Sequence, residues 1–227
     1  MKRKIITTSD GSKTIQIEEW DEQYHSKHGA VQEAYHVFIK QGLSLFENRK
    51  VEILEIGFGT GLNALITWKE AGKYNLEVAY TGVEAYPVTK EEVEQLDYIN
   101  QLNAHALATG FEKMHDAPWE ETINLTDKFT LYKQQKDFMD IEDSDRYNLI
   151  YFDAFGARVQ PELWTEAIFQ KMFNALGQNG VLVTYAAKGS VRRAMQAVGF
   201  NVERLPGPPG KREMLRAVKT ALDSDKS

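Results

Sequence analysis

A glycine-rich run, Glu55-Ile56-Gly57-Phe58-Gly59-Thr60-Gly61, follows an apolar segment and precedes a helical pattern. Glycines let a backbone turn tightly and approach a ligand with no Cβ in the way. The first turn of the following helix then offers free N–H groups. The G-x-G-x-G spacing differs from the dinucleotide fingerprint G-x-G-x-x-G, because Leu62 takes the place of its last glycine. The run predicts a ligand-binding turn, with a purely structural turn as the alternative.

The acid before these glycines indicates which ligand the turn would hold. Glu55 would repel a pyrophosphate, whereas it suits a ligand that ends in a cationic amino acid. S-adenosylmethionine (SAM) is such a ligand, and it carries a transferable methyl group on a sulfonium. We therefore expect Glu55, Gly57, Gly59 and Gly61 to form part of a SAM site.

Two further acids follow later strands of the expected sheet. Glu84 ends the second strand, 23 residues after Gly61, where a carboxylate can accept both ribose hydroxyls of a nucleoside. Asp137 follows the third strand and could bond the adenine amino group. A helix N-cap is an equally good interpretation of Asp137.

Asp153 ends the fourth expected strand, in Tyr151-Phe152-Asp153-Ala154-Phe155. Open α/β sheets bind ligands at the carboxyl ends of their strands, so Asp153 should face the methyl donor. It could accept N–H bonds from an amine substrate and take its proton. Phe155 and Phe58 could shape an apolar slot around the reacting groups. The alternative for Asp153 is an aspartate that only caps a loop.

Other kinds of catalytic site find little support in the sequence. The five histidines show no metal-ligand spacing, although His25 and His28 lie three apart, and cysteine is absent. No G-x-S-x-G elbow and no Walker loop occurs. We therefore predict neither a metal site nor a hydrolase nucleophile.

Strands alternate with helices along the chain, which favours a mostly parallel sheet covered on both faces. A hairpin is expected around Asp10-Gly11 and a helix at residues 30–45. A capping box of Thr89 and Glu92 opens a helix that reaches Ile99, and Pro161 begins another. The expected strands of the sheet lie at residues 51–56, 77–83, 129–133, 147–153, 180–185, 200–205 and 213–219.

The predicted fold class is α/β, a Rossmann-like class I SAM methyltransferase. Its seven-stranded, mostly parallel sheet ends in a C-terminal antiparallel hairpin, which a NAD-binding Rossmann domain lacks. Residues 1–48 form an N-terminal hairpin and a helical entry segment packed on the same domain. Residues 49–221 form the methyltransferase domain, and residues 222–227 a flexible tail.

Composition limits where the protein works and what it binds. The 227 residues carry a formal net charge of −6, which argues against unspecific coating of nucleic acid. There is no apolar run long enough for a membrane span and no secretory signal, so we expect a cytoplasmic protein without membrane contact. Basic residues gather near the C-terminus, where they form either a contact for RNA phosphates or a solvated face. These residues are Lys188, Arg192, Arg193, Arg204, Lys211, Arg212, Arg216 and Lys219.

Several motifs together resemble the MnmC-type tRNA methyltransferases, the methyltransferase half of the bifunctional 5-methylaminomethyl-2-thiouridine biosynthesis proteins. The resemblance extends from about Asp21 to Val218. It rests on Tyr24-His25-Ser26 through Glu33, Gly57-Phe58-Gly59-Thr60-Gly61-Leu62-Asn63, Glu84-Ala85-Tyr86-Pro87-Val88-Thr89, Asp153-Ala154-Phe155, Pro161-Glu162-Leu163-Trp164-Thr165, Gly189-Ser190-Val191-Arg192-Arg193 and Gly210-Lys211-Arg212-Glu213-Met214-Leu215.

This resemblance implies methyl transfer from SAM to the primary amine of 5-aminomethyl-(2-thio)uridine at the tRNA wobble position. It implies cofactor contacts from Phe58 and Asn63, beside the glycines and acids named above. Contacts to substrate or RNA are expected from Tyr24, Glu33, Lys188, Arg192, Arg193, Lys211 and Arg212. In bifunctional relatives an FAD-dependent domain supplies the amine.

Three points follow from where the sequence departs from that pattern or leaves choices open. No second dinucleotide motif occurs, so a separate FAD-dependent oxidase or an upstream tRNA-modifying enzyme is the expected partner. Gly156-Ala157 replaces the family's usual Ala-Pro after Asp153-Ala154-Phe155, which predicts a more flexible loop. A small-molecule amine methyltransferase and a non-catalytic SAM-fold interaction module remain alternatives, while Leu62 disfavours a NAD dehydrogenase.

Overall fold

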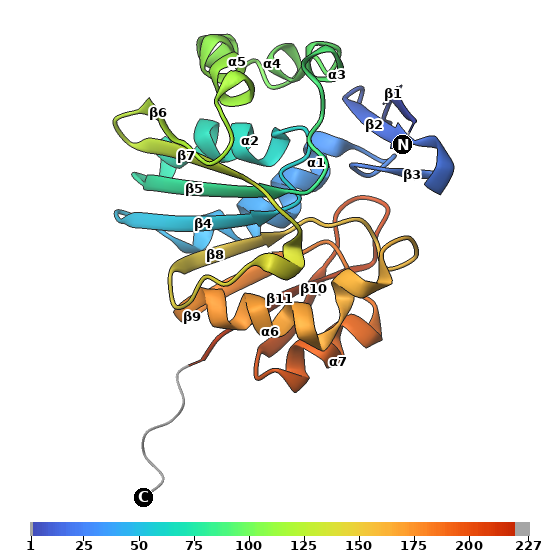
Figure 1. The fold of residues 1–227 in the computed structure, drawn as a ribbon, viewed down its shortest axis with the longest axis vertical. Coiled ribbons are helices and arrows are strands. Elements are labelled where there is room, and N and C mark those ends of the chain that lie inside the picture. Colours follow the sequence, from blue (N-terminus) through green and yellow to red (C-terminus); the bar gives the residue numbers. More distant parts are fainter. Residues whose placement is uncertain (1, 221–227) are drawn as a thin grey trace, which may run out of the picture.

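One sheet of eight strands organises the protein, in the order β10-β11-β9-β8-β4-β5-β7-β6 (Figure 1). The computed structural model describes residues 2–220, so the tail expected at residues 222–227 lies outside the described residues. The strands are β4 (Lys50–Ile56), β5 (Glu77–Glu84), β6 (Thr122–Thr126), β7 (Phe129–Gln135), β8 (Tyr147–Phe152), β9 (Leu176–Thr184), β10 (Asn201–Pro206) and β11 (Glu213–Val218).

The centre of the sheet is parallel, and its C-terminal end is an antiparallel hairpin. β4 pairs in parallel with β5 and β8, and the pairs β5–β7 and β8–β9 are also parallel. β11 runs antiparallel to both β9 and β10. The chain moves outward from β4 to β5 and β7 and then returns to β8, so the strand order reverses between β4 and β8. Ligands bind at such a switch point in open α/β sheets.

The sheet has one strand more than the seven predicted. β6 lies antiparallel to β7 at the edge, in a segment outside the seven expected strands. Its residues alternate between half-buried and exposed. Such an edge strand carries too little apolar character for its sequence to stand out.

Helices cover both faces of the sheet (Figure 1). Residues of α1 and α2 join the buried cluster on one face, and residues of α6 and α7 join the cluster on the other. The α-helices are α1 (Ala30–Ala34), α2 (Leu62–Ala71), α3 (Lys90–Glu94), α4 (Tyr98–Gln101), α5 (Ala108–Asp116), α6 (Glu166–Ala175) and α7 (Gly189–Ala197). None of the helices in residues 2–220 has the length and apolar character that crossing a bilayer requires.

Two long helices predicted from the sequence are divided in the structure. The expected helix at residues 30–45 consists of α1, a π-helical turn η2 (Tyr35–Lys40) and a 3-10 turn η3 (Leu43–Leu45). The capping box of Thr89 and Glu92 does open α3, but that helix ends at Glu94. Asp97 takes a left-handed conformation with φ of 53° and starts α4 instead.

Two boundaries near the C-terminal half also differ from prediction. Pro161 opens a 3-10 turn, η7 (Pro161–Trp164), and α6 begins separately after Thr165. The strand expected at residues 180–185 is β9, which already begins at Leu176. Asn179, inside β9, has a φ of 61°, and the pairing of β9 with β8 shifts register, so the strand is irregular in this part.

A small second sheet lies beside the carboxyl edge of the large one. It consists of β1 (Arg3–Thr7), β2 (Lys13–Ile17) and β3 (Glu22–Gln23), and β1 and β2 form the predicted hairpin. The Arg3 guanidinium donates to the carbonyls of Tyr86 and Pro87, in the loop after β5. On the other side, the Arg158 guanidinium donates to the Trp20 carbonyl. These bonds tie the small sheet to loops on both sides of the switch point.

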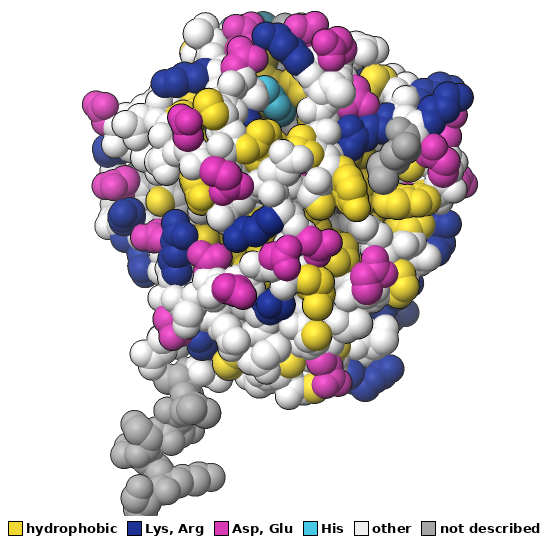
Figure 2. Space-filling view, in the orientation of Figure 1, with side chains coloured by type: hydrophobic (Ala, Val, Ile, Leu, Met, Phe, Trp, Pro, Cys, Tyr) yellow, Lys and Arg dark blue, Asp and Glu magenta, His cyan; other side chains and the backbone are white. Residues whose placement is uncertain are grey.

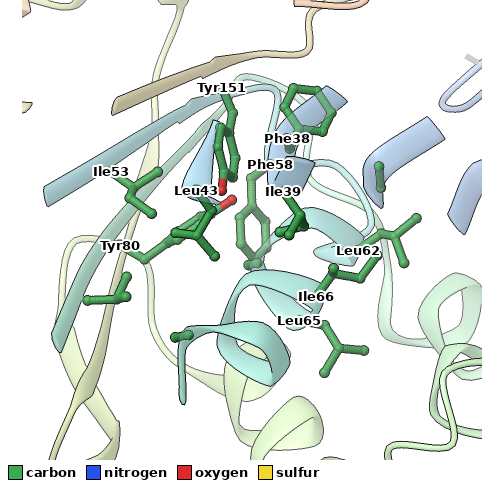
Figure 3. Packing of buried hydrophobic residues seen from close by; sticks show 14 of the residues in the cluster. Phe38, Ile39, Leu43, Ile53, Phe58, Leu62, Leu65, Ile66, Tyr80 and Tyr151 are labelled. Carbon is green, nitrogen blue, oxygen red and sulfur yellow. The ribbon is translucent and has the colours of Figure 1, made fainter. Parts of the chain in front are cut away.

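Large aromatic side chains fill the core beneath that switch point. Figure 3 shows the ring of Phe58 among Tyr80, Tyr151 and aliphatic residues of α2 and η2. Tyr80 and Tyr151 are each at most 1% exposed. Burying one such large apolar side chain contributes about 1.5–3 kcal/mol. The core beneath the switch point is therefore tightly packed and supports the loops that follow β4 and β8.

Candidate functional site

A cavity of about 430 Å³ opens at the carboxyl ends of β4, β5 and β8, under the small sheet. This volume is in the range of small-molecule sites. The cavity brings together most of the residues predicted from the sequence. They are Tyr24, Glu33, Gly57, Phe58, Gly59, Asn63, Glu84, Asp137, Asp153, Phe155 and Lys211.

The glycine-rich turn has a backbone that only glycine adopts freely. Gly57, Gly59 and Gly61 have φ of 89°, 50° and 72°. A Cβ at Gly57 would lie 2.8 Å from the carbonyl oxygen of Asp153, so the turn after β4 packs directly on the end of β8. Gly61 is the N-cap residue of α2 and does not line the cavity. Gly57 and Gly59 leave the cavity wall free of side chains.

Glu84 closes the turn from the end of β5. Its Oε2 accepts from the Gly59 amide at 3.0 Å, and its Oε1 accepts from the Tyr86 amide at 2.9 Å. Burial raises the pKa of Glu84, which these backbone donors partly oppose. Each oxygen keeps lone pairs, so the carboxylate can accept further hydrogen bonds from hydroxyl groups in the cavity.

Asn63, in the first turn of α2, joins two carboxylates. Its Nδ2 donates at 2.8 Å to Glu55 and at 2.8 Å to Asp153. Glu55 also accepts from the Tyr80 hydroxyl at 2.8 Å, and burial raises its pKa well above the ordinary value. Glu55 is 1% exposed and does not line the cavity. The structure therefore places Glu55 behind Asn63, where it orients the amide instead of facing a ligand.

The arrangement suits SAM. Asn63 Oδ1 is buried and has no hydrogen-bond partner among the described residues, although Asn63 lies in the cavity wall. An ammonium group would satisfy this acceptor. Glu84 and Asp153 add negative charge for a cationic ligand, and the glycine turn gives it room. The residues present therefore fit a nucleoside that carries a cationic amino-acid end.

Asp153 lies at the junction of β8 with the glycine turn. Its amide donates to the Ile56 carbonyl at 2.9 Å, which joins the ends of β8 and β4. The side chain is half-buried and open to the cavity. Burial, and then the negative charge of Glu33, raise the pKa of Asp153 to about 7, while the Asn63 hydrogen bond opposes the rise. Asp153 can therefore accept or release a proton near neutral pH.

An ion pair faces Asp153 from two distant parts of the sequence. Lys211 Nζ contacts Glu33 Oε1, and Glu33 Oε2 accepts from the Ser26 amide at 3.0 Å. Lys211 Nζ also lies 3.9 Å from the centre of the Tyr185 ring. The Tyr185 hydroxyl donates to the Ala154 carbonyl at 2.8 Å, so Lys211 is held beside the reacting end of β8.

The two phenylalanines expected to shape an apolar slot have different places. The Phe155 ring packs edge-on against Trp20 and Tyr24, with ring centres 5.5 and 5.0 Å away. Phe58 contributes to the cavity wall but is 3% exposed, and its ring packs over Gly82 in the core. Phe155 can therefore line a slot, while Phe58 mainly supports the turn from below.

The structure confirms the capping role of Asp137 and also places this residue in the cavity wall. Its Oδ1 accepts from the Met139 amide at 2.8 Å and caps the 3-10 turn η6 (Phe138–Asp140). Asp137 is also exposed and lines the cavity. A contact to an adenine amino group remains a prediction.

The basic residues near the C-terminus are not gathered at this cavity, apart from Lys211. Lys188 and Arg212 line a second, adjoining cavity. Arg192 and Arg193 lie on α7 and line neither. Closeness to Lys211 in the sequence therefore does not predict which of these basic residues lie near the expected reaction centre.

Several residues of the cavity wall were not selected from the sequence. Tyr185 directly follows β9, so the rule that singled out Asp153 at the end of β8 could also have found it. Trp20 and His25 also line the cavity. They come from the small sheet and its connection, and no strand-end rule places them there.

No group of three or more His, Cys, Asp or Glu side chains in residues 2–220 is arranged to hold a metal ion. His25 Nδ1 forms a 2.9 Å hydrogen bond with Thr14 Oγ1. Burial lowers the pKa of His25 to about 4, so this ring is neutral at physiological pH. His25 therefore packs as an uncharged wall residue.

Comparison with known families adds independent information. The model of a family described as S-adenosyl-L-methionine-dependent methyltransferase matches residues 91–220, which is more than half of the chain. Among solved structures, the crystal structure of MnmC2 from Aquifex aeolicus superposes with a TM-score of 0.76 at 25% identity, covering 97% of this chain and 72% of the other.

The curated relatives carry the name MnmC. The tRNA 5-methylaminomethyl-2-thiouridine biosynthesis bifunctional protein MnmC of Paraburkholderia xenovorans is 29% identical over 86% of this chain. The protein of that name from Leptospira interrogans is 28% identical over 87% of this chain. In both cases the match covers 32% of the relative, so the chain spans about a third of the length of these proteins.

Proposed function

The chain belongs to the S-adenosyl-L-methionine-dependent methyltransferase family, and we propose that it methylates the primary amine of 5-aminomethyl-(2-thio)uridine at the wobble position of tRNA. SAM is its cofactor. The names of the MnmC relatives support the choice of tRNA. The observation that carries the proposal is the Asp153 carboxylate, which is open to the cavity and joined to the glycine turn through Asn63.

The residues of the wall have distinct roles in holding the cofactor. Gly57 and Gly59 accommodate it, and Glu84 accepts hydrogen bonds from its ribose. The free Oδ1 of Asn63 and the Asp153 carboxylate face its cationic groups. When bound, SAM supplies an electrophilic methyl group. Glu55 takes part indirectly, because it fixes the orientation of the Asn63 amide.

Asp153 and its neighbours prepare the amine for attack. The amine must be neutral to attack, and the sulfonium of bound SAM, together with the Lys211 ammonium, disfavours a further positive charge beside it. With SAM bound, the amine nitrogen would receive the methyl group, and the electron pair of the methyl–sulfur bond would stay on sulfur. The resulting ammonium gives one proton to Asp153 or, through water, to solvent. The pKa of Asp153, about 7 in the free protein, suits this exchange.

The amine substrate has to be supplied by a preceding reaction. A separate FAD-dependent oxidase or an upstream tRNA-modifying enzyme is the partner that we propose, in line with the bifunctional nature of the named relatives. A cytoplasmic location, where tRNA is modified, remains a prediction.

Incubation with labelled SAM and tRNA from a strain that lacks the methylated nucleoside tests this function. We expect nucleoside mass spectrometry to show label in 5-methylaminomethyl-(2-thio)uridine and in no other nucleoside. Label in a small amine but not in tRNA would favour a small-molecule methyltransferase. SAM binding with no turnover on tRNA or amines would instead favour a non-catalytic module.

A further inference from the structure

We infer that a second cavity, adjoining the cofactor cavity, receives the target nucleotide of the RNA, with the base inside and the neighbouring phosphates on unpaired basic side chains at its rim. This inference rests on the proposed RNA substrate. It goes further by giving that substrate a separate site.

The second cavity has a volume of about 530 Å³ and shares three wall residues with the first. These residues are Gly156, Tyr185 and Lys211. A Cβ added at Gly156 would meet nothing closer than the Tyr185 hydroxyl at 3.7 Å. The loop that departs from the family pattern at Gly156-Ala157 therefore leaves space where the two cavities adjoin. A group held in the second cavity can reach toward Asp153 in the first.

The inner wall suits a flat, partly apolar group. It includes Trp164, Tyr185, Ala187 and Val191. The Trp164 indole donates to the Phe155 carbonyl at 2.8 Å, which fixes that ring against the loop after β8. Trp164 and Tyr185 lie edge to face with ring centres 6.0 Å apart. Proteins that take single-stranded RNA commonly place unstacked bases against such aromatic side chains.

The rim carries positive charge that no carboxylate neutralises. Among residues 2–220, no Asp or Glu oxygen lies within 4 Å of the side-chain nitrogens of Lys188, Arg192, Arg193 or Arg212. Other basic residues of the C-terminal part are paired, with partners Glu33 for Lys211, Glu213 for Arg204, Glu203 for Arg216 and Asp145 for Lys219. Among the basic residues from Lys188 to Lys219, those without a carboxylate partner therefore lie at the mouth of the second cavity and on the first turns of α7.

A polyanion explains this distribution better than a neutral ligand does. Unpaired surface cations attract phosphates and release counterions when they bind them. Lys188 and Arg212 line the cavity itself, and Arg192 and Arg193 continue the charge along α7. Glu213, the acid in this wall, is paired with Arg204 at 3.8 Å, and Arg158 is paired with Glu22 at 2.7 Å. The charged side chains that remain unpaired in this wall are therefore positive, although the protein as a whole has a formal net charge of −6.

Photocrosslinking tests the position of the nucleotide without requiring turnover. An anticodon stem-loop RNA with 5-iodouridine at the wobble position is irradiated with the full chain, and the crosslinked peptide is sequenced by mass spectrometry. We expect adducts on Trp164 or Tyr185. No crosslink above that of a scrambled RNA, or crosslinks confined to other surfaces, would overturn the inference.

A filling variant gives an independent readout. Ala187 lines only the second cavity, so Ala187→Trp should leave SAM affinity unchanged while kcat/KM for tRNA falls by about 100-fold. Ala197→Trp, at the exposed end of α7, is the matched control and should behave as wild type. Normal turnover by Ala187→Trp overturns the pocket while the proposed function stands. Crosslinking inside the cavity without any methylation of tRNA would keep the pocket and refute the proposed reaction.

Discussion

The two cavities at the carboxyl edge of the sheet share a wall but differ in charge. The wall of the first contains Glu33, Glu84 and Asp153, whose carboxylates are held by backbone amides, by Asn63 or by Lys211. The rim of the second carries Lys188 and Arg212 with no acidic partner among the described residues. One cavity is therefore prepared for a cation and the other for a polyanion.

The comparison also shows how differently the two sites are held in place. Glu33 and Glu84 are buried, Asp153 is half-buried, and all three accept fixed hydrogen bonds, so their geometry exists before a ligand arrives. The cations of the second cavity are exposed side chains that can adjust to a flexible RNA. Lys211 belongs to both walls and is paired with Glu33, which places the reaction centre where the two regions meet.

Removal of the Asp153 carboxylate is the strongest test of this difference between the two cavities. We expect Asp153→Ala to lower kcat for methyl transfer by about 10²–10⁴-fold, because the amine loses both its orienting group and its proton acceptor. SAM affinity should fall much less, because Glu84 and Asn63 remain. Steady-state kinetics and calorimetry measure the two effects. Asp153→Asn keeps the size of the side chain, and if it restored activity, a role for the carboxylate in proton transfer would be excluded.

The pH dependence of cofactor binding tests the charge of the first cavity. The positive charges of SAM favour the carboxylate form of Asp153, so binding lowers a pKa that is about 7 in the free protein and releases a proton. Affinity should therefore rise with pH, by up to about tenfold per unit below pH 7, and level off above it.

Calorimetry in two buffers of different ionisation enthalpy would detect the released proton. The nearest charged neighbours are Glu33, which opposes ionisation of Asp153, and Lys211, which favours it. Asp153→Asn should flatten the profile in this range. An unchanged profile in that variant would assign the titration to another group.

Neutralising the rim of the second cavity should affect RNA but not SAM. The double variant Lys188→Gln/Arg212→Gln is expected to weaken tRNA binding roughly tenfold at low salt and to reduce the salt slope by about 2. Filter binding over a salt series measures both. The matched control is Arg204→Gln/Arg216→Gln, which removes the same charge from side chains that are already paired. An equal loss of tRNA affinity in both double variants would show that binding depends only on the net charge of the protein.

The smallest effect is expected at the small N-terminal sheet, which covers the first cavity. Arg3→Ala removes bonds to the carbonyls of Tyr86 and Pro87 and an ion pair with Glu92 at 3.0 Å. SAM should then dissociate a few times faster, since a partly exposed ion pair contributes only about 1 kcal/mol. Stopped-flow fluorescence measures the rate. A matching change in tRNA affinity would contradict the separation of the two cavities.

The amino-acid sequence alone determined the framework of the site. Alternating strands and helices, the left-handed glycines of the turn and the acids at strand ends are local patterns, so Gly57, Glu84 and Asp153 could be placed at one edge. The antiparallel C-terminal hairpin was predicted for the same reason. The sequence did not predict that the helices expected at residues 30–45 and 89–99 are divided, nor that β6 forms an edge strand. Packing overrides weak local preference in such short segments.

Only the tertiary structure decided what each acid does and which cations belong together. Glu55 and Asp153 share the donor Asn63, yet one lies sealed in the core beside Tyr80 and the other faces the cavity. Glu33 and Lys211 meet across 178 residues of sequence. Side-chain type and spacing report the chemistry that a residue can do, whereas burial and pairing between distant segments set its charge, its partners and the ligand that it can meet.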